Sequence, residues 1–214
     1  IKNNEHFIEA LRRAVECASL ADKMVFCGDN IDAVSNDQNV SLFREIVWDK
    51  YPDALCVVGN HDSFYGDYDR YRQKVSDIWP HDSYYYSERV GSVVLVCIDD
   101  AAGVVNDEQC GKLADDILRA REKGETILLF HHIRFTGLDS VKASNERFKK
   151  LIKENGDVIR ALFAGHQHID TCGEIPATYV DAQGQTVNTV IPYYQILGCP
   201  DEETMGNVLR IFVK

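Results

Sequence analysis

Four segments of the chain carry apolar residues three or four positions apart, with charged residues between them. This spacing places the apolar side chains on one face of a helix. It predicts helices over residues 5–20, around 42–47, from 106 or 107 to 124, and over 144–154.

Short apolar runs lie between these segments. Runs at residues 24–27, 54–58, 127–130 and 161–164 are typical of strands buried on both faces. Further strands are predicted at residues 84–86, 93–98, 186–191 and 208–213, the first two forming a hairpin. Residues 63–90, rich in Tyr, Asp and Ser, are expected to be largely irregular. This order of helices and strands predicts one layered α/β domain over residues 1–214, with helices packed on sheets.

Each of the four buried runs ends in a polar cluster. The clusters are Gly28-Asp29, Gly59-Asn60-His61-Asp62, His131-His132 and Gly165-His166-Gln167-His168. Ligands of α/β sheets bind at the carboxyl ends of the strands. If the four strands are parallel neighbours, their polar side chains meet in one patch.

Each cluster alone also has an ordinary structural explanation. Asp29 is the kind of residue that caps a helix or forms a turn, and paired histidines often simply end a strand. His166 and His168 are more distinctive, because side chains two positions apart point the same way on an extended backbone. Four such clusters at four strand ends favour a metal site.

The residue types in the clusters restrict the metal. Imidazole, carboxylate and amide groups without thiolate suit Mn, Fe, Zn, Co or Ni, and they are too rich in histidine for Ca²⁺. A carboxylate that can bridge two ions suits a two-metal site for phosphoryl displacement. His61 and Asp62 then become candidates for proton transfer, with the carboxylate orienting the imidazole.

The overall composition argues against some classes of protein. A net charge of −11 argues against extensive nucleic-acid binding, and no apolar run reaches the roughly 20 residues of a membrane span. The seven cysteines include no CxxC pair, and several lie in apolar runs. They are interpreted as buried hydrophobic residues, which favours a reducing, cytoplasmic compartment.

In order and in strand-end placement, Gly28-Asp29, Gly59-Asn60-His61-Asp62, His131 and Gly165-His166-Gln167-His168 resemble the calcineurin-like metallophosphoesterase superfamily. The resemblance implies a β-sandwich flanked by helices, in αββα layers, with two divalent metal ions at the strand ends.

The same resemblance implies roles for individual residues. Asp29 would bridge both metals, and His168 would bind the first. The second metal would be bound by Asn60, His131 and His166, with His131 preferred to His132 because the family's ligand directly follows the apolar run. His61 would protonate the leaving group or stabilise the transition state, and Asp62 would hold His61.

One motif of the superfamily is missing. Its first motif, Asp-x-His at the end of the first strand, has no counterpart here, because Asn4-Glu5-His6 follows no strand and leads directly into a helix. Asn3 or Asn4 is better interpreted as the N-cap of that helix. We therefore expect an N-terminally incomplete domain whose first strand, ending in Asp-x-His, lies upstream. His131-His132-Ile133 also lacks the Pro common after this histidine in the family.

The expected function is hydrolysis of a small phosphomonoester or phosphodiester by attack of a metal-bound hydroxide. Two alternatives stay open: a nuclease with the same dinuclear site, and a non-catalytic metal-binding scaffold. The acidic composition disfavours the nuclease, and the presence of His61, which no metal needs, disfavours the scaffold.

Overall fold

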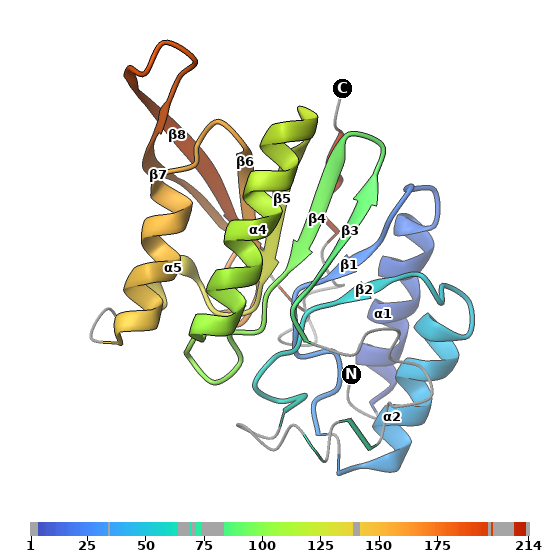
Figure 1. The fold of residues 1–214 in the computed structure, drawn as a ribbon. Coiled ribbons are helices and arrows are strands. Elements are labelled where there is room, and N and C mark those ends of the chain that lie inside the picture. Colours follow the sequence, from blue (N-terminus) through green and yellow to red (C-terminus); the bar gives the residue numbers. More distant parts are fainter. Residues whose placement is uncertain are drawn as a thin grey trace.

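The computed structural model describes residues 4–33, 35–63, 69, 72–73, 84–138, 142–196, 198 and 208–212. Within them the chain forms two β-sheets with helices on the outer sides of both (Figure 1). No helix in this part of the chain is long and apolar enough to cross a membrane.

The first part of the chain builds a small sheet and the helices beside it. Its elements are α1 (Glu5–Ala18), β1 (Val25–Phe26), α2 (Asp37–Phe43), the π-helix η1 (Arg44–Trp48) and β2 (Leu55–Cys56). The side chain of Asn4 caps α1 by accepting a hydrogen bond from the His6 backbone N–H, which confirms Asn4 as the N-cap. Strands β1 and β2 pair in parallel.

The remaining elements build a six-stranded sheet and a second helical layer. They are β3 (Tyr86–Val90), β4 (Val93–Cys97), α4 (Asp107–Lys123), β5 (Thr126–His131), the 3₁₀ helix η2 (Phe135–Gly137), α5 (Ala143–Lys153), β6 (Ile159–Ala164), β7 (Thr171–Val180) and β8 (Thr186–Gln195). The strand order is β3-β4-β5-β6-β8-β7, in which β4, β5, β6 and β8 run parallel. The outer strands β3 and β7 run antiparallel to their neighbours.

Alternate side chains of the six-stranded sheet pack in opposite directions, as the pleat requires. One set packs against α4 and α5 and includes Val94, Val96, Ile127 and Leu129. The other set packs against the small sheet and includes Leu95, Leu128, Phe130 and Phe163. The second face of the small sheet packs against α1 and α2. The layers are therefore αββα, as the resemblance implied.

The structure confirms the predicted helices and most of the predicted strands, with three differences. The four strands that carry the polar clusters are not all neighbours, because β1 and β2 form a sheet of their own. Strand β7 was not predicted, because Gly173 and Pro176 interrupt its pattern; as an edge strand it tolerates both. Residues 208–212 are exposed and in no strand. Most of 63–83 lies outside the described residues.

Candidate metal centre

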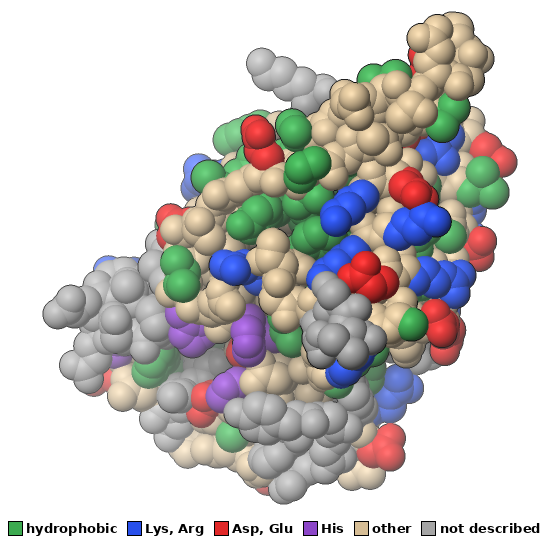
Figure 2. Space-filling view, turned by 90° about the vertical axis from the view of Figure 1, so that its left-hand side faces the viewer, with side chains coloured by type: hydrophobic (Ala, Val, Ile, Leu, Met, Phe, Trp, Pro, Cys, Tyr) green, Lys and Arg blue, Asp and Glu red, His purple; other side chains and the backbone are tan. Residues whose placement is uncertain are grey.

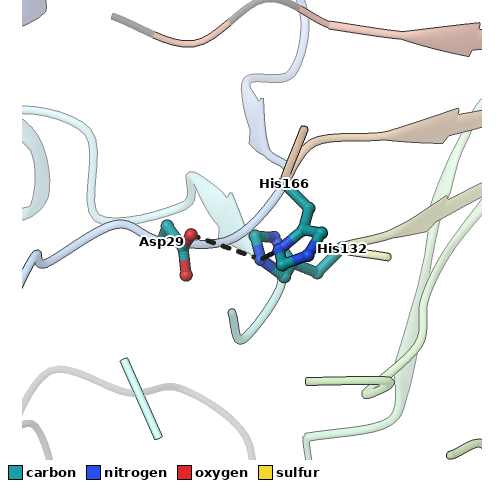
Figure 3. Close-up of side chains that lie close together, drawn as sticks. All are labelled: Asp29, His132 and His166. Carbon is teal, nitrogen blue, oxygen red and sulfur yellow. Dashed lines mark hydrogen bonds and ion pairs between the residues drawn. The ribbon is translucent and has the colours of Figure 1, made fainter. Parts of the chain in front are cut away.

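Four strands from the two sheets bring their carboxyl ends to one place. Asp29 follows β1, Asn60 follows β2, His132 follows β5 and His166 follows β6. Figure 3 shows Asp29, His132 and His166 turned toward one another, and histidine and acidic side chains gather on this face of the molecule (Figure 2). Among the described residues, these three form the one group of His, Cys, Asp or Glu whose possible ligand atoms lie within 4.8 Å of one another.

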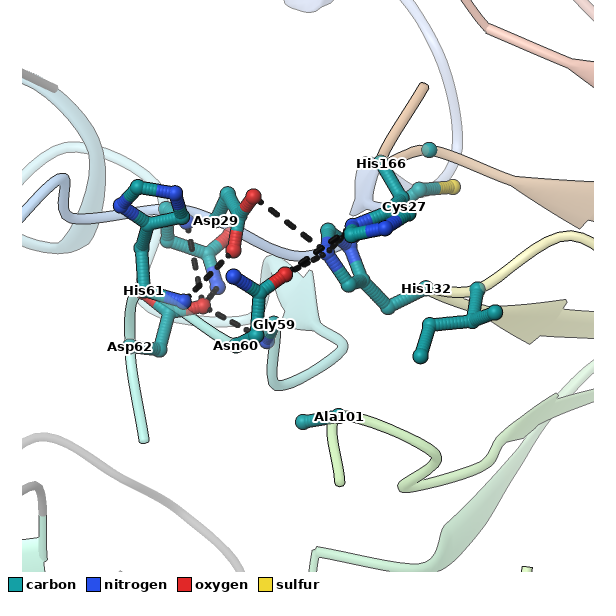
Figure 4. A network of polar contacts seen from close by, with 12 residues as sticks. Cys27, Asp29, Gly59, Asn60, His61, Asp62, Ala101, His132 and His166 are labelled. Carbon is teal, nitrogen blue, oxygen red and sulfur yellow. Dashed lines mark hydrogen bonds and ion pairs between the residues drawn. The ribbon is translucent and has the colours of Figure 1, made fainter. Parts of the chain in front are cut away.

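Asn60 adds a fourth possible ligand atom to the cluster (Figure 4). Its Oδ1 lies 3.0 Å from both His132 Nε2 and His166 Nδ1. The two imidazole nitrogens are 3.1 Å apart, and His132 Nε2 lies 3.3 Å from Asp29 Oδ2. Ligands about 2.0–2.2 Å from one ion lie about 2.8–3.6 Å from each other across adjacent octahedral or tetrahedral positions. The observed separations fit a single divalent ion.

Hydrogen bonding fixes which nitrogen of His132 faces the cluster. Its Nδ1 lies 2.9 Å from the backbone carbonyl oxygen of Cys27, which can only accept, so Nδ1 carries the proton. In the neutral ring Nε2 is then a lone pair aimed at Asp29 and Asn60. Histidine ligands in metal sites are commonly oriented in this way by a carbonyl behind them.

The charges in the cluster show that it attracts a cation. Burial alone would lower the pKa of His132, but the hydrogen bond to Asp29 and the charges of Asp29 and Asp100 outweigh burial and raise this pKa to about 9. Burial would raise the pKa of Asp29, yet His132 holds it below the usual value. Burial and the positive charge of His132 both lower the pKa of His166. The same charges would favour a divalent cation at the position between these groups.

Backbone strain also concentrates here. Asp29, His166 and His168 have φ angles of 53°, 71° and 50°, and they are the non-glycine residues with positive φ among those described. Such conformations are unfavourable for residues with a Cβ and cluster at functional sites. Gly59 permits the close approach of two of the loops, because a Cβ on it would collide with the backbone N and carboxylate of Asp29.

The structure does not bring His131 to this cluster, and brings His132 instead. Strand β5 continues through His131, whose side chain lies on the same face as Leu129 and Ile127, toward α5. The ring is 1% exposed and its Nδ1 lies 3.0 Å from Asp100 Oδ2. The side chain of His132 points to the opposite face of the strand, the face of Phe130, toward the small sheet and Asp29.

His61 lies beside the cluster, but its partner is Asp32 and not Asp62. Its Nδ1 is 3.0 Å from the Asp32 carbonyl oxygen and 3.5 Å from Asp32 Oδ1. The fully buried Asp62 instead accepts hydrogen bonds from the backbone N–H groups of Asn30, Ile31 and Gly59. It joins the loop after β1 to the loop after β2, and Figure 4 shows it turned away from the His61 ring.

His168 is exposed and does not belong to the group around Asp29, although its backbone shares the left-handed strain. The geometry adds Asp32 and Asp100 to the residues considered from the sequence, and it favours His132 over His131. The alternation of side chains along the strand could have identified His132, because His132 lies on the same face as Leu128 and Phe130 and not on that of Leu129. Nothing in the local sequence marks the other two.

Comparison with known proteins identifies the family. The family model for calcineurin-like phosphoesterases matches residues 2–170. The chain is a calcineurin-like phosphoesterase. The crystal structure of a dimetal phosphatase from Danio rerio has the same fold, with a TM-score of 0.59 and 14% sequence identity over 89% of this chain and 77% of that one. No curated protein matches this phosphoesterase significantly in sequence.

Membership of the family makes this chain a metal-dependent hydrolase of phosphoric esters and implies divalent metal ions as its cofactors. The residues around Asp29 fit such an ion. Asp29 and Asn60 offer oxygen atoms that only accept, and His132 and His166 offer nitrogen atoms at matching separations.

Proposed function

We propose that this phosphoesterase hydrolyses a small phosphomonoester or phosphodiester at a centre built on Asp29, Asn60, His132 and His166. The observation that supports this proposal most strongly is the convergence of two oxygen and two nitrogen atoms at 3.0–3.3 Å. The four atoms offer more lone pairs than there are protons to share between them, and a divalent cation would accept the remaining lone pairs.

These four residues would hold one ion, with His132 in the place that the resemblance gave to His131. Asp29 and His168 are the described residues that we assign to a second ion. Bound divalent ions would lower the pKa of a water molecule and neutralise charge on the phosphoryl oxygens.

We assign proton transfer to His61. Because its Nδ1 lies against the Asp32 carbonyl oxygen, Nδ1 donates and Nε2 is the nitrogen that exchanges a proton with the leaving oxygen. The Asp32 carboxylate lies 3.5 Å from the same Nδ1 and helps to orient the ring. In this proposal Asp32 takes the orienting role expected of Asp62, and Asp62 holds the two loops together.

The test is a substrate and metal panel on the full-length protein. Metal-free protein is loaded with Mn, Fe, Zn, Co or Ni and assayed on an aryl phosphomonoester, an aryl phosphodiester and a single-stranded oligonucleotide. We expect hydrolysis of one of the small esters, lost on chelation and lost with the bound metal in Asp29→Asn. Oligonucleotide cleavage without small-ester hydrolysis would indicate a nuclease, and metal binding without any hydrolysis a scaffold; either result would refute the proposal.

A further inference from the structure

A second buried acid lies directly behind the metal centre. Asp100 follows β4, is 0% exposed, and uses both carboxylate oxygens. Oδ1 accepts from the backbone N–H of His132 at 2.8 Å, and both oxygens accept from the N–H of Ile133 at 3.0–3.1 Å. Oδ2 also lies 3.0 Å from Nδ1 of the buried His131.

These contacts act at the point where β5 leaves the sheet. A buried carboxylate is costly unless hydrogen bonds satisfy it, and those of Asp100 come from three consecutive residues of one turn. The carboxylate thereby fixes the backbone at His132, and the backbone direction determines where the His132 ring points. The Cys27 carbonyl fixes the same ring from its Nδ1 side.

His131 supports Asp100 from the helical side of the sheet. Its ring stands near Phe148 of α5, with the centroids 6.4 Å apart, so packing between the sheet and α5 restrains the ring that contacts Asp100. A chain of contacts thus connects α5 to His131, Asp100, the His132 backbone and the ligand cluster.

We propose that Asp100, with His131 behind it, is a positioning residue that sets the His132 imidazole at the metal centre. This role rests on the proposed function, because it requires His132 to be a ligand. Asp100 touches neither the cluster atoms nor a substrate in this role and acts only through His132. Partners behind a metal ligand typically change metal affinity by about 10- to 100-fold when they are replaced.

The test compares two buried carboxylates by a readout of the metal itself. Asp100→Asn replaces one accepting carboxylate oxygen by an amide NH₂ group. This group then faces either a backbone N–H or the His131 ring. We expect it to weaken Co²⁺ binding by about 10- to 100-fold and to alter the visible absorption spectrum of the Co²⁺-saturated protein. The control is Asp116→Asn. Asp116 is 3% exposed, and its hydrogen-bond partners, Tyr85 and Arg119, belong neither to the cluster nor to the turn after β5.

Asp116→Asn should lower the melting temperature while leaving Co²⁺ affinity and spectrum unchanged. If Asp100→Asn behaves in the same way, Asp100 is only a stabilising residue and the proposal fails. If Asp100→Asn does not fold, His131→Phe provides the test, because it removes the ring nitrogen and keeps the packing beside Phe148; wild-type affinity and spectrum would then refute the role. Wild-type protein that binds no divalent ion would instead refute the proposed function.

Discussion

Replacement of His61 by alanine should separate proton transfer from metal binding. The backbone N–H of His61 donates to Asp29 Oδ1 at 2.9 Å, and alanine keeps this N–H. The imidazole instead contacts Asp32. The variant should therefore bind divalent ions within about threefold of wild-type affinity, a change of less than about 0.7 kcal/mol.

The expected loss in turnover is much larger. General acid catalysis is worth about 10²- to 10⁴-fold, or about 2.7–5.4 kcal/mol of activation free energy at about 1.36 kcal/mol per factor of ten. The loss should depend on the leaving group. An alkoxide needs the proton from His61, whereas a nitrophenolate departs without it, so the deficit should be near the upper bound for an alkyl ester and much smaller for a nitrophenyl ester.

The assay measures turnover by metal-loaded wild-type and His61→Ala protein. The substrates are a series of phosphate esters that differ only in the basicity of the leaving group. Metal content is measured on the same samples. Asp32→Asn should show the same dependence with a smaller loss, because the Asp32 backbone carbonyl still holds Nδ1. An equal loss for every leaving group, or a loss that follows metal content, would refute proton donation by His61.

Three further predictions concern metal binding and stability. Gly59→Ala should displace Asp29 and lower metal affinity at least tenfold, as measured by calorimetric titration. The control is Gly111→Ala in α4, where no atom lies within 4 Å of the new Cβ. It should keep the metal affinity and stabilise the fold by about 0.5–1 kcal/mol, as measured by urea unfolding. A divalent ion at 100 times its Kd should raise the unfolding free energy by about 2.7 kcal/mol, and unchanged unfolding curves would argue against binding to the folded chain. Burial raises the pKa of Asp157, but the hydrogen bonds and charge of Arg121 outweigh it and lower this pKa; the stability from the pair is present above about pH 4 and lost as pH falls through the folded value. Asp157→Asn should therefore cost about 1 kcal/mol at most at pH 7 and progressively less as the pH falls through the folded pKa of Asp157, and a cost that does not change with pH would exclude the ion pair as its source.

The sequence was sufficient for the parts of the site that lie next to their strands. Asp29, Asn60 and His166 each follow a short apolar run after a single glycine, and this placement brings all three into the cluster. The choice between His131 and His132 depended on where β5 ends. The apolar run stops at Phe130 but the strand includes one more residue, so the first histidine after the run, His131, points toward α5, and the second, His132, points toward Asp29.

The partners of the charged groups could not be predicted, because they are long-range contacts. Asp62 is adjacent to His61 in sequence, which suggested a pair, yet its carboxylate bonds to backbone groups of Asn30 and Ile31 in another loop. Asp32 reaches His61 across 29 positions, and Asp100 reaches His132 across 32. Each pairing joins loops that follow neighbouring strands of one sheet, β1 and β2 for the contacts of Asp62 and Asp32, and β4 and β5 for that of Asp100. Strand pairing therefore determines which acid lies near which histidine.

The position of the centre between the two sheets connects the core to the chemistry. Asp29 and Asn60 come from the small sheet, whereas His132 and His166 come from the six-stranded sheet. The spacing of the ligand atoms therefore depends on how closely the sheets pack. Tyr86 helps to fix this spacing, because its buried hydroxyl accepts from the Cys56 N–H at 2.8 Å and donates to the Cys56 carbonyl at 3.0 Å, across the two sheets. An ion at the centre would join the sheets at one end as Tyr86 joins them within the core, so that stability of the sandwich and affinity for the metal arise from the same interface.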